Sequence, residues 1–256
     1  MLEHRMYASA LGSMKGIILA GGRGTRLYPL TKATNKHLLP VGTEPMLFHP
    51  LRQMLSAGIT DILVVTSTEH MGDIVNCLGS GAAFGCTLTY RVQDAAGGIA
   101  QALALGEGFA AGNRSCVLLG DNIFEYTIAP YVTRFAQQPA GARVLLTPVS
   151  DPNRYGIAAL DEHHIIEIEE KPRQPKSTLA VVGLYLYDAQ VFDIIRRIQP
   201  SARGELEITA VNNIYIEQKQ LEYDVCRGRW TDAGTFDSYH EANRILADCK
   251  NHILSD

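Results

Sequence analysis

Apolar and polar positions along this chain form short apolar runs separated by longer mixed segments. Runs rich in β-branched and aliphatic residues occur at 15–20, 61–66, 87–91, 115–119 and 142–147. The segments between them are long enough to hold helices. Parallel strands need such long crossovers, whereas antiparallel strands can be joined by tight turns. The pattern therefore predicts an α/β fold: a Rossmann-like, mostly parallel open sheet flanked by helices.

Three segments carry helical patterns. From 46 to 57, apolar residues recur at helical spacing, and Gly58 is the expected stop. We interpret the two methionines in this segment as core residues and not as ligands. A second apolar stripe covers 191–198 and ends before a proline, and a third helix is expected over 236–247.

A glycine-rich loop follows the first apolar run. Residues 19–27 read LAGGRGTRL, so the first strand leads into three glycines, a threonine and two arginines. Glycine lets successive backbone N–H groups point at one anion, and arginine adds positive charge. The loop therefore predicts a polyphosphate site, and with it an enzyme that handles nucleotides.

Two other phosphate loops do not fit this segment. A Walker loop needs Gly-Lys followed by Ser or Thr, whereas Gly24 is followed by Thr25. A dinucleotide fingerprint needs a third glycine where this chain has Leu27, and an acidic residue where the second strand ends in Thr66. For the glycines taken alone, a structural turn is the remaining alternative.

Several polar residues follow predicted strands, as the glycine loop does. Gln93, Asp121 and Asp232 each stand at or just beyond the end of such a strand. In an open α/β sheet, ligands gather beyond the carboxyl ends of the strands. We therefore expect these residues and the loop to meet in one crevice.

Composition limits the partners of the chain. The formal net charge of −4 over 256 residues argues against a general nucleic-acid binder. No apolar run approaches the roughly 20 residues that span a bilayer, so no membrane association is expected. The five cysteines form no Cys-x-x-Cys pair, which favours reduced thiols and a cytoplasmic location over a zinc site or a disulfide framework.

Further strings complete a recognisable signature. They read YPLT at 28–31, NKHLLP at 35–40, PM at 45–46, VQDAAGGIAQA at 92–102, LGDNIF at 119–124, DPNRYG at 151–156, EEKP at 169–172, PSARGELEIT at 200–209 and WTDAGT at 230–235. From Met14 almost to its C-terminus, the chain resembles the sugar-1-phosphate nucleotidylyltransferases, in particular the short form of the glucose-1-phosphate thymidylyltransferase branch. The resemblance implies magnesium-assisted in-line attack of glucose-1-phosphate on the α-phosphorus of dTTP, which yields dTDP-glucose and pyrophosphate.

The resemblance also assigns roles to individual residues. Arg26 and Lys36 match catalytic cations that neutralise the phosphates. Asp121 and Asp232 match two carboxylates that hold Mg²⁺, although an isolated aspartate after a strand is often a helix cap. The nucleotide-binding set is Leu19, Gly21, Gly22, Gly24, Thr25, Gln93, Gly98 and Asp121. The sugar-phosphate set is Asn122, Gly156, Glu170, Lys171, Val181, Tyr185 and Arg203.

The resemblance divides the chain by substrate. Short strands expected around 167–171 and 180–187 suggest a small β-rich, sugar-binding part over about 151–225. The nucleotide half then covers about 14–150 plus 226–250, within a single domain over 14–256. We interpret residues 1–13 as a tag or leader, because Gly12-Ser13 before Met14 resembles a cloning junction.

Several alternatives stay open from the sequence. UTP could replace dTTP, because no sequence motif shows which residues surround the ribose and would distinguish the two nucleotides. A non-catalytic nucleotide-sugar sensor is a more distant reading, since a sensor would be expected to lose the catalytic charges. His37 stands where many family members carry glutamine, which either alters nucleotide preference or has no effect. The resemblance favours a homo-oligomer, a dimer or tetramer. Long members of the family carry an additional C-terminal helical segment that helps to form a feedback-inhibitor site. Because this segment is not seen here, we expect weak or absent inhibition by the product nucleotide sugar.

Overall fold

The expected strands come together in one mixed sheet. The computed structural model describes residues 14–253, and within them nine strands form the sheet in the order β10-β9-β11-β6-β1-β4-β5, with β8 beside β11 and β12 beside β8. These strands are β1 (Lys15–Ala20), β4 (Asp61–Ser67), β5 (Thr87–Gln93), β6 (Ser115–Leu119), β8 (Ala142–Pro148), β9 (Gly156–Asp161), β10 (His164–Glu170), β11 (Leu179–Tyr187) and β12 (Leu221–Val225). Each of the five predicted apolar runs is confirmed as a strand, to within two residues at its end.

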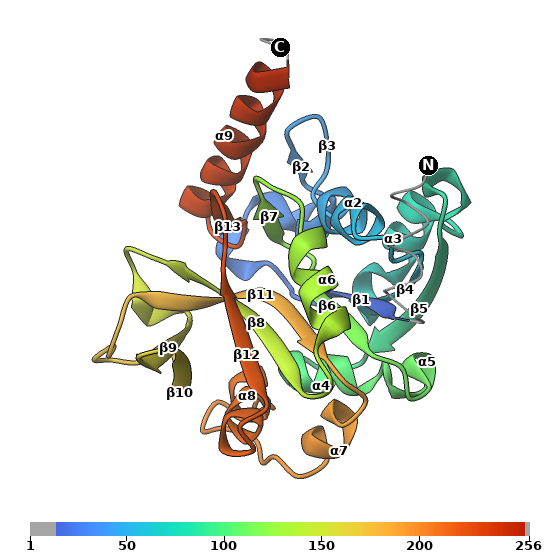
Figure 1. The fold of residues 1–256 in the computed structure, drawn as a ribbon. Helices are drawn as coiled ribbons and strands as arrows, with labels where there is room; N and C mark the ends of the chain where they lie inside the picture. Colours follow the sequence, from blue (N-terminus) through green and yellow to red (C-terminus); the bar gives the residue numbers. More distant parts are fainter. Residues whose placement is uncertain (1–13, 254–256) are drawn as a thin grey trace.

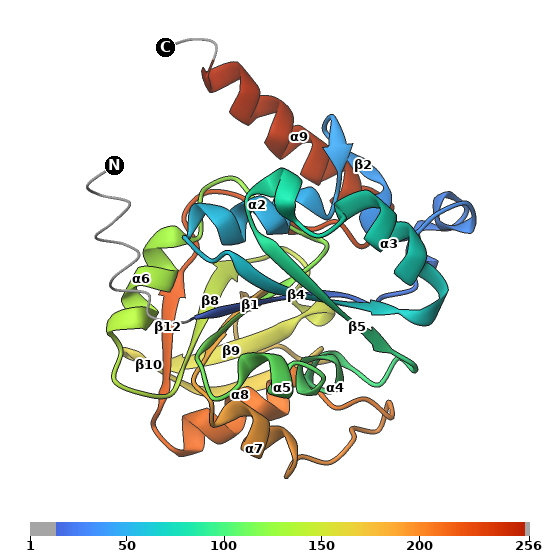
Figure 2. The same ribbon diagram turned by 90° about the vertical axis from the view of Figure 1, so that its right-hand side faces the viewer.

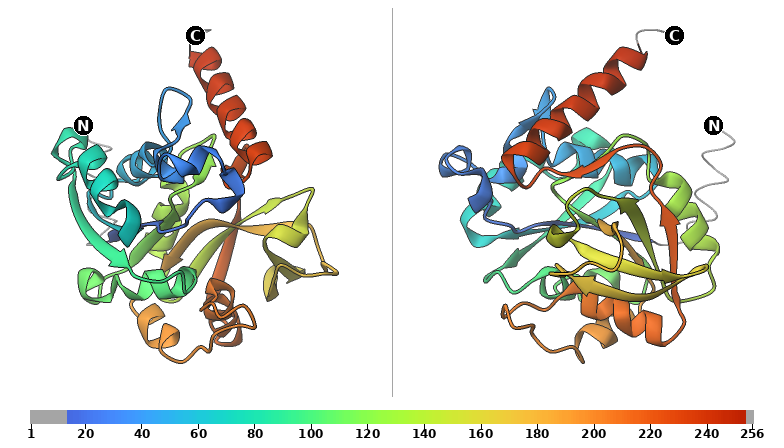
Figure 3. Two further views of the ribbon diagram at one scale, coloured as in Figure 1. Left: turned by 180° about the vertical axis from the view of Figure 1, so that it is seen from behind. Right: turned by 90° about the vertical axis from the view of Figure 1, so that its left-hand side faces the viewer.

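Strand direction divides the sheet. β5, β4, β1 and β6 are parallel neighbours, and β12 is parallel to β8. β11 runs antiparallel to β6, β8 and β9, and β9 and β10 form an antiparallel hairpin. The predicted parallel arrangement is therefore found in the part of the sheet formed by β1, β4, β5 and β6. The β9–β10 hairpin lies at the side of the sheet away from β5 (Figure 3).

Helices cover both faces of the sheet (Figures 1 and 2). They are α2 (Phe48–Ser56), α3 (Met71–Leu78), α4 (Ile99–Ala104), α5 (Glu107–Ala110), α6 (Ala129–Gln137), α7 (Val191–Ile195), α8 (Ile208–Glu217) and α9 (Phe236–Ile253). Short 3-10 turns occur at η1 (Thr25–Leu27), η2 (Leu30–Lys32), η3 (Lys36–Leu38), η4 (Thr68–His70), η5 (Ala82–Phe84) and η6 (Pro152–Arg154). All three predicted helices are present, and α9 runs six residues beyond its predicted end.

Alternation along β1 separates two apolar cores. Ile17 and Leu19 pack in one cluster with residues of α4, α5, α7 and α8, whereas Ile18 packs in a second cluster with residues of α2, α3 and α6. Successive strand side chains point to opposite faces, so one buried strand serves both cores. Met46 and Met54 are fully buried, which confirms them as core residues, and Gly58 stops α2 with a φ of 79°.

Two short ribbons bring distant segments to the end of the sheet. β2 (Pro40–Val41) pairs with β3 (Glu44–Pro45), and β7 (Asn122–Phe124) pairs antiparallel with β13 (Trp230–Asp232). A third apolar cluster beneath α9 joins these ribbons and includes Val41, Ile123 and Ala233. The pairing of β7 with β13 thus holds Asp232 beside Asn122, which follows shortly after the end of β6. Among residues 14–253, no helix is both long and apolar enough to cross a membrane.

Candidate active site

A cleft of about 340 Å³ opens where β1, β5 and β6 end. It is also lined from β11, β13 and α8, so both halves of the sheet contribute to it. Of the predicted site residues, the structure places these at its walls: Leu19, Gly21, Gly22, Arg26, Lys36, Gln93, Gly98, Asp121, Asn122, Gly156, Glu170, Lys171, Val181, Tyr185 and Asp232. Gly24, Thr25 and Arg203 lie outside the lining.

The glycine loop makes room for Lys36. A Cβ at Gly22 would lie 3.1 Å from Cε of Lys36, and one at Gly24 would lie 2.8 Å from its Cβ. Gly24 also has a φ of 65° and precedes Thr25, the first residue of η1. Gly24 and Thr25 therefore shape the turn that carries Arg26, which explains why they themselves do not face the cleft.

Lys36 and Asp121 form an ion pair at the floor of the cleft. Their Nζ and Oδ2 atoms are 2.5 Å apart, and their side chains are only 11% and 14% exposed. Oδ1 of Asp121 accepts a hydrogen bond of 2.9 Å from the amide of Asn122. Burial opposes ionisation of Asp121, but the Lys36 charge and these hydrogen bonds outweigh burial and hold its pKa well below the usual range.

Asp232 lies close to Asp121 because β13 pairs with β7. Asp232 stands opposite Asn122 in this ribbon, and the backbone N–H of Ala233 donates to the carbonyl oxygen of Asp121 at 2.8 Å. Burial and the Asp121 charge raise the pKa of Asp232, and Arg154 opposes that rise. Two coupled carboxylates fit a hard divalent cation. Within residues 14–253, no group of three or more His, Cys, Asp or Glu residues could hold a metal ion.

Gln93 is fixed at the end of the cleft beside the glycine loop. Its amide N–H₂ donates to Oε1 of Gln101 at 2.8 Å and to the carbonyl of Gly98 at 3.3 Å. Its Oε1 would lie 2.7 Å from a Cβ at Gly21, so a larger residue at position 21 would force the Gln93 amide to move. Gly98 has a φ of 99°, and a Cβ on it would lie 2.5 Å from the carbonyl oxygen of Leu206. These contacts hold an amide next to the predicted phosphate loop.

Glu170 and Lys171 stand at the opposite end of the cleft. Oε2 of Glu170 accepts a hydrogen bond of 2.6 Å from the hydroxyl of Thr209, and a Cβ at Gly156 would lie 3.4 Å from the same oxygen. The Nζ of Lys171 is 3.7 Å from the other Glu170 oxygen. Arg203 lies at the rim, paired with Glu170 and with two further carboxylates.

Asn122 connects the parts of the site. Its Oδ1 accepts from the backbone N–H of Gly183 at 2.9 Å and from Nε1 of Trp230 at 2.7 Å, while its amide donates to Asp121. The side chain is buried, and a Cβ at Gly183 would lie 2.5 Å from its Oδ1. Asn122 therefore holds β11, β13 and the Asp121 carboxylate in one arrangement.

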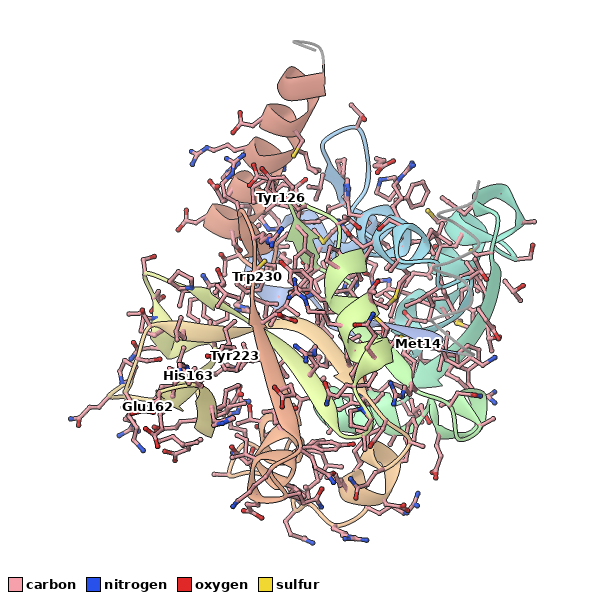
Figure 4. The ribbon with its side chains drawn as sticks, in the orientation of Figure 1. Met14, Tyr126, Glu162, His163, Tyr223 and Trp230 are labelled. Carbon is pink, nitrogen blue, oxygen red and sulfur yellow. The ribbon has the colours of Figure 1, made fainter. Side chains whose placement is uncertain are left out.

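Several lining residues were not assigned by the sequence. Among them are the polar and aromatic residues His37, Arg154, Tyr155, Thr209, Asn212 and Trp230. Most of them lie within the sequence strings that carried the resemblance. The sequence therefore indicated the segments that form the site, but not the contacts that these side chains make. Trp230 lies on β13 close to the centre of the molecule (Figure 4), and its ring meets that of Tyr155 edge to face at 5.6 Å. His163 is exposed at the tip of the β9–β10 hairpin (Figure 4) and does not line the cleft.

His37 is a buried neutral side chain. Its backbone N–H and its ring Nδ1 both contact Oδ1 of Asn35 at 2.8 Å, so Nδ1 carries the proton. Burial and the neighbouring Lys36 charge lower the pKa of His37 to about 3. The ion pair of Lys36 and Asp121 thus lies beside a neutral imidazole.

Comparison with known proteins identifies the class to which this fold and cleft belong. The sequence pattern of the nucleotidyl transferase family matches residues 15–248. The chain belongs to the nucleotidyl transferase family and is an enzyme of that class.

Relatives within the family narrow the comparison. The chain is 43% identical over 242 residues to the glucose-1-phosphate thymidylyltransferase of Neisseria meningitidis serogroup A, covering 93% of this chain and 84% of the relative. It is 57% identical to a solved structure from Bacillus anthracis, described as a glucose-1-phosphate thymidylyltransferase with sucrose, with a TM-score of 0.89 and coverage of 92% and 96%. A UDP-glucose pyrophosphorylase with UDP-glucose shares the fold, with a TM-score of 0.81 at 23% identity and coverage of 93% and 99%.

Proposed function

We propose that this enzyme makes dTDP-glucose and pyrophosphate from dTTP and glucose-1-phosphate. One observation carries the proposal: a single cleft is lined by the glycine loop, Arg26 and Gln93 and also by Glu170 and Lys171, together with Lys36 and the two aspartates. The relatives from Neisseria meningitidis and Bacillus anthracis bear the name of this activity. A site of this shape accommodates a nucleoside triphosphate and a sugar phosphate together.

The reaction needs charge neutralisation more than covalent chemistry. A phosphate oxygen of the sugar attacks the α-phosphorus, a new P–O bond forms, and the bond to the β-phosphate oxygen breaks so that pyrophosphate leaves. Both reactants are polyanions, so fixed cations lower the barrier by offsetting their repulsion. Lys36, which the glycine loop encloses, is suited to contact phosphates of both reactants, and Arg26 is suited to stabilise the leaving pyrophosphate.

The ends of the cleft bind the two reactants. Gln93 carries an amide that can both donate to and accept from a pyrimidine edge, and Gly98 allows the backbone to approach closely. Glu170 is suited to accept hydrogen bonds from sugar hydroxyls and Lys171 to bind the sugar phosphate. This division makes residues of about 14–150 and 226–250 the nucleotide half and about 151–225 the sugar half.

Asp121 and Asp232 are the residues that would hold Mg²⁺. These carboxylates would hold the ion beside the triphosphate, where it would supply positive charge that stabilises the transition state. Asp121 is suited to this task because its pKa is held low, so the carboxylate stays ionised throughout the neutral range.

Pyrophosphate release tests the proposal. The full chain is assayed with Mg²⁺, glucose-1-phosphate and each of dTTP, UTP, CTP, GTP and ATP in turn. We expect release that requires the sugar phosphate and is fastest with dTTP. Preference for UTP would keep the mechanism and change the nucleotide, whereas no release with any pair, other sugar phosphates included, would favour a sensor.

Assembly and location complete the proposal. We expect a dimer or tetramer of this chain in the cytoplasm, where the nucleoside triphosphate and the sugar phosphate are available. Light scattering of the eluted protein measures the assembly directly, and a monomer at assay concentration would contradict it.

A further inference from the structure

The two candidate metal ligands, Asp121 and Asp232, already contact cationic side chains and hydrogen-bond donors of the protein itself. Nη2 of Arg154 lies 3.1 Å from each carboxylate oxygen of Asp232, and the hydroxyl of Tyr155 donates to Oδ1 at 3.1 Å. At Asp121, Lys36 contacts Oδ2 and Asn122 contacts Oδ1. Each of the four carboxylate oxygens therefore accepts at least one hydrogen bond from a side chain.

This cluster carries no net negative charge. Lys36 and Arg154 are positive, Asp121 and Asp232 are negative, and Arg26 adds a further positive charge that acts on Asp232. A divalent cation that entered alone would add two positive charges to a cluster that is already neutral or positive. A polyphosphate would bring the negative charge that offsets them. The free enzyme is therefore poorly arranged for a metal ion and well arranged for a metal ion with a nucleotide.

The two cations differ in their freedom to move. Lys36 belongs to η3, is 9% exposed as a residue and is enclosed by the glycine loop. Arg154 ends η6 in the connection from β8 to β9, and its side chain is 28% exposed. Its only ion pair among residues 14–253 is with Asp232, and its guanidinium stacks over the Tyr155 ring at 5.2 Å. Arg154 can leave its carboxylate without breaking other ion pairs.

We propose that Arg154 is an exchangeable counter-ion of the metal site. In the free enzyme it occupies Asp232, and it leaves this carboxylate when a divalent ion binds together with the triphosphate. Its guanidinium, part of the lining of the cleft, can then pair with phosphate oxygens. Arg154 is thus a positioning residue that links metal binding to nucleotide binding. The inference rests on the proposed function for the identity of the polyphosphate.

Binding of Mn²⁺ alone tests the exchange. The free Mn²⁺ signal in electron paramagnetic resonance measures affinity in the full chain without nucleotide. We expect Arg154→Gln to bind Mn²⁺ at least about tenfold more tightly than the wild type, within the usual range of coupling between sites. Arg154→Lys keeps the charge and should bind as weakly as the wild type. Arg52→Gln, which removes an exposed pair with Glu44, is the matched control and should leave the affinity unchanged.

The outcomes separate this inference from the proposed function. Unchanged or weaker Mn²⁺ binding in a folded Arg154→Gln protein would overturn the exchange, and so would equal tightening in Arg154→Lys. If the glutamine variant loses its circular dichroism spectrum, Arg154→Met keeps the aliphatic stem over Tyr155 and repeats the measurement. Because no turnover is needed, the Mn²⁺ result stands even if the wild type releases no pyrophosphate.

Discussion

Removal of the Asn122 side chain should destabilise the fold and the site together. In Asn122→Ala, the backbone N–H of Gly183 and the indole N–H of Trp230 lose their shared acceptor, and Asp121 loses a donor. A buried donor left without a partner costs about 1–3 kcal/mol, so the two donors together cost roughly 2–6 kcal/mol. Water from the adjoining cleft can satisfy part of this loss, so we expect about 2–4 kcal/mol.

The geometry explains why no other group replaces this acceptor. The pairing of β11 with β8 shifts register between Val181 and Tyr185, so the Gly183 N–H turns out of the ladder and donates to Asn122. Such a bulge leaves one backbone group unpaired, and here a side chain satisfies it. Because total stability of a domain is typically about 5–15 kcal/mol, a loss of this size is readily measured.

Urea unfolding followed by circular dichroism measures the effect. We expect a lower midpoint at an unchanged slope, which means lower stability without a change in the surface exposed on unfolding. Asn153→Ala is the matched control: the same truncation at an exposed residue of η6 should cost less than about 0.5 kcal/mol. A loss below about 1 kcal/mol in Asn122→Ala, or one equal to that of the control, would refute this reasoning.

Three further outcomes are expected. Asp121→Asn should lower turnover at least about 100-fold while the circular dichroism spectrum is retained, because it removes a charge at nearly constant shape; activity equal to the wild type would exclude Asp121 as a metal ligand. Gly98→Ala should raise KM for the triphosphate, because its Cβ would lie 2.5 Å from the Leu206 carbonyl, whereas Gly108→Ala, which meets open space, should leave KM unchanged. Because the pKa of His37 is lowered to about 3, the unfolded chain binds a proton below about pH 6.5 that the folded chain does not, so stability falls as pH falls through that window. From pH 7 to pH 5 the loss should be roughly 2 kcal/mol; His37→Gln should remove it, and the same slope in that variant would assign it to other groups.

Strands and helices with strong local patterns were predictable from the sequence. The apolar runs of β1 and β6 have the predicted bounds, because strands buried on both faces read as continuous apolar segments. The direction of β11 was not predictable in this way. A buried strand has the same apolar composition whether it runs parallel or antiparallel to its neighbour, and its partner β6 lies about sixty residues earlier in the chain. The mixed half of the sheet therefore appears only in the structure.

The candidate site was predictable to the extent that its residues stand in linear strings. Asp121 and Asp232 were paired through the resemblance, and the structure brings them together through the three-residue strands β7 and β13. Strands this short carry too few residues for a periodic pattern, so the ribbon itself left no signal. The link between Asn122 and Gly183 was equally hidden, although a glycine inside a strand does suggest a bulge.

Arg203 shows that a sequence motif does not reveal which carboxylates a cationic side chain pairs with in the folded protein. The sequence assigns it to the sugar phosphate, yet the structure holds it at the rim, where Nη2 lies 2.8 Å from Glu207, 3.3 Å from Glu205 and 3.4 Å from Glu170. Binding phosphate would require Arg203 to leave these carboxylates, as Arg154 would leave Asp232.

Cations that stood unpaired along one cleft would repel one another, so carboxylate partners stabilise the free enzyme. Arg26 differs from these cations, because no carboxylate among residues 14–253 lies within ion-pair distance of it. It can therefore meet a triphosphate first, without exchanging a partner. On the proposed function, we therefore expect Arg26 to engage phosphate before Arg154, because only Arg154 has to leave a carboxylate first.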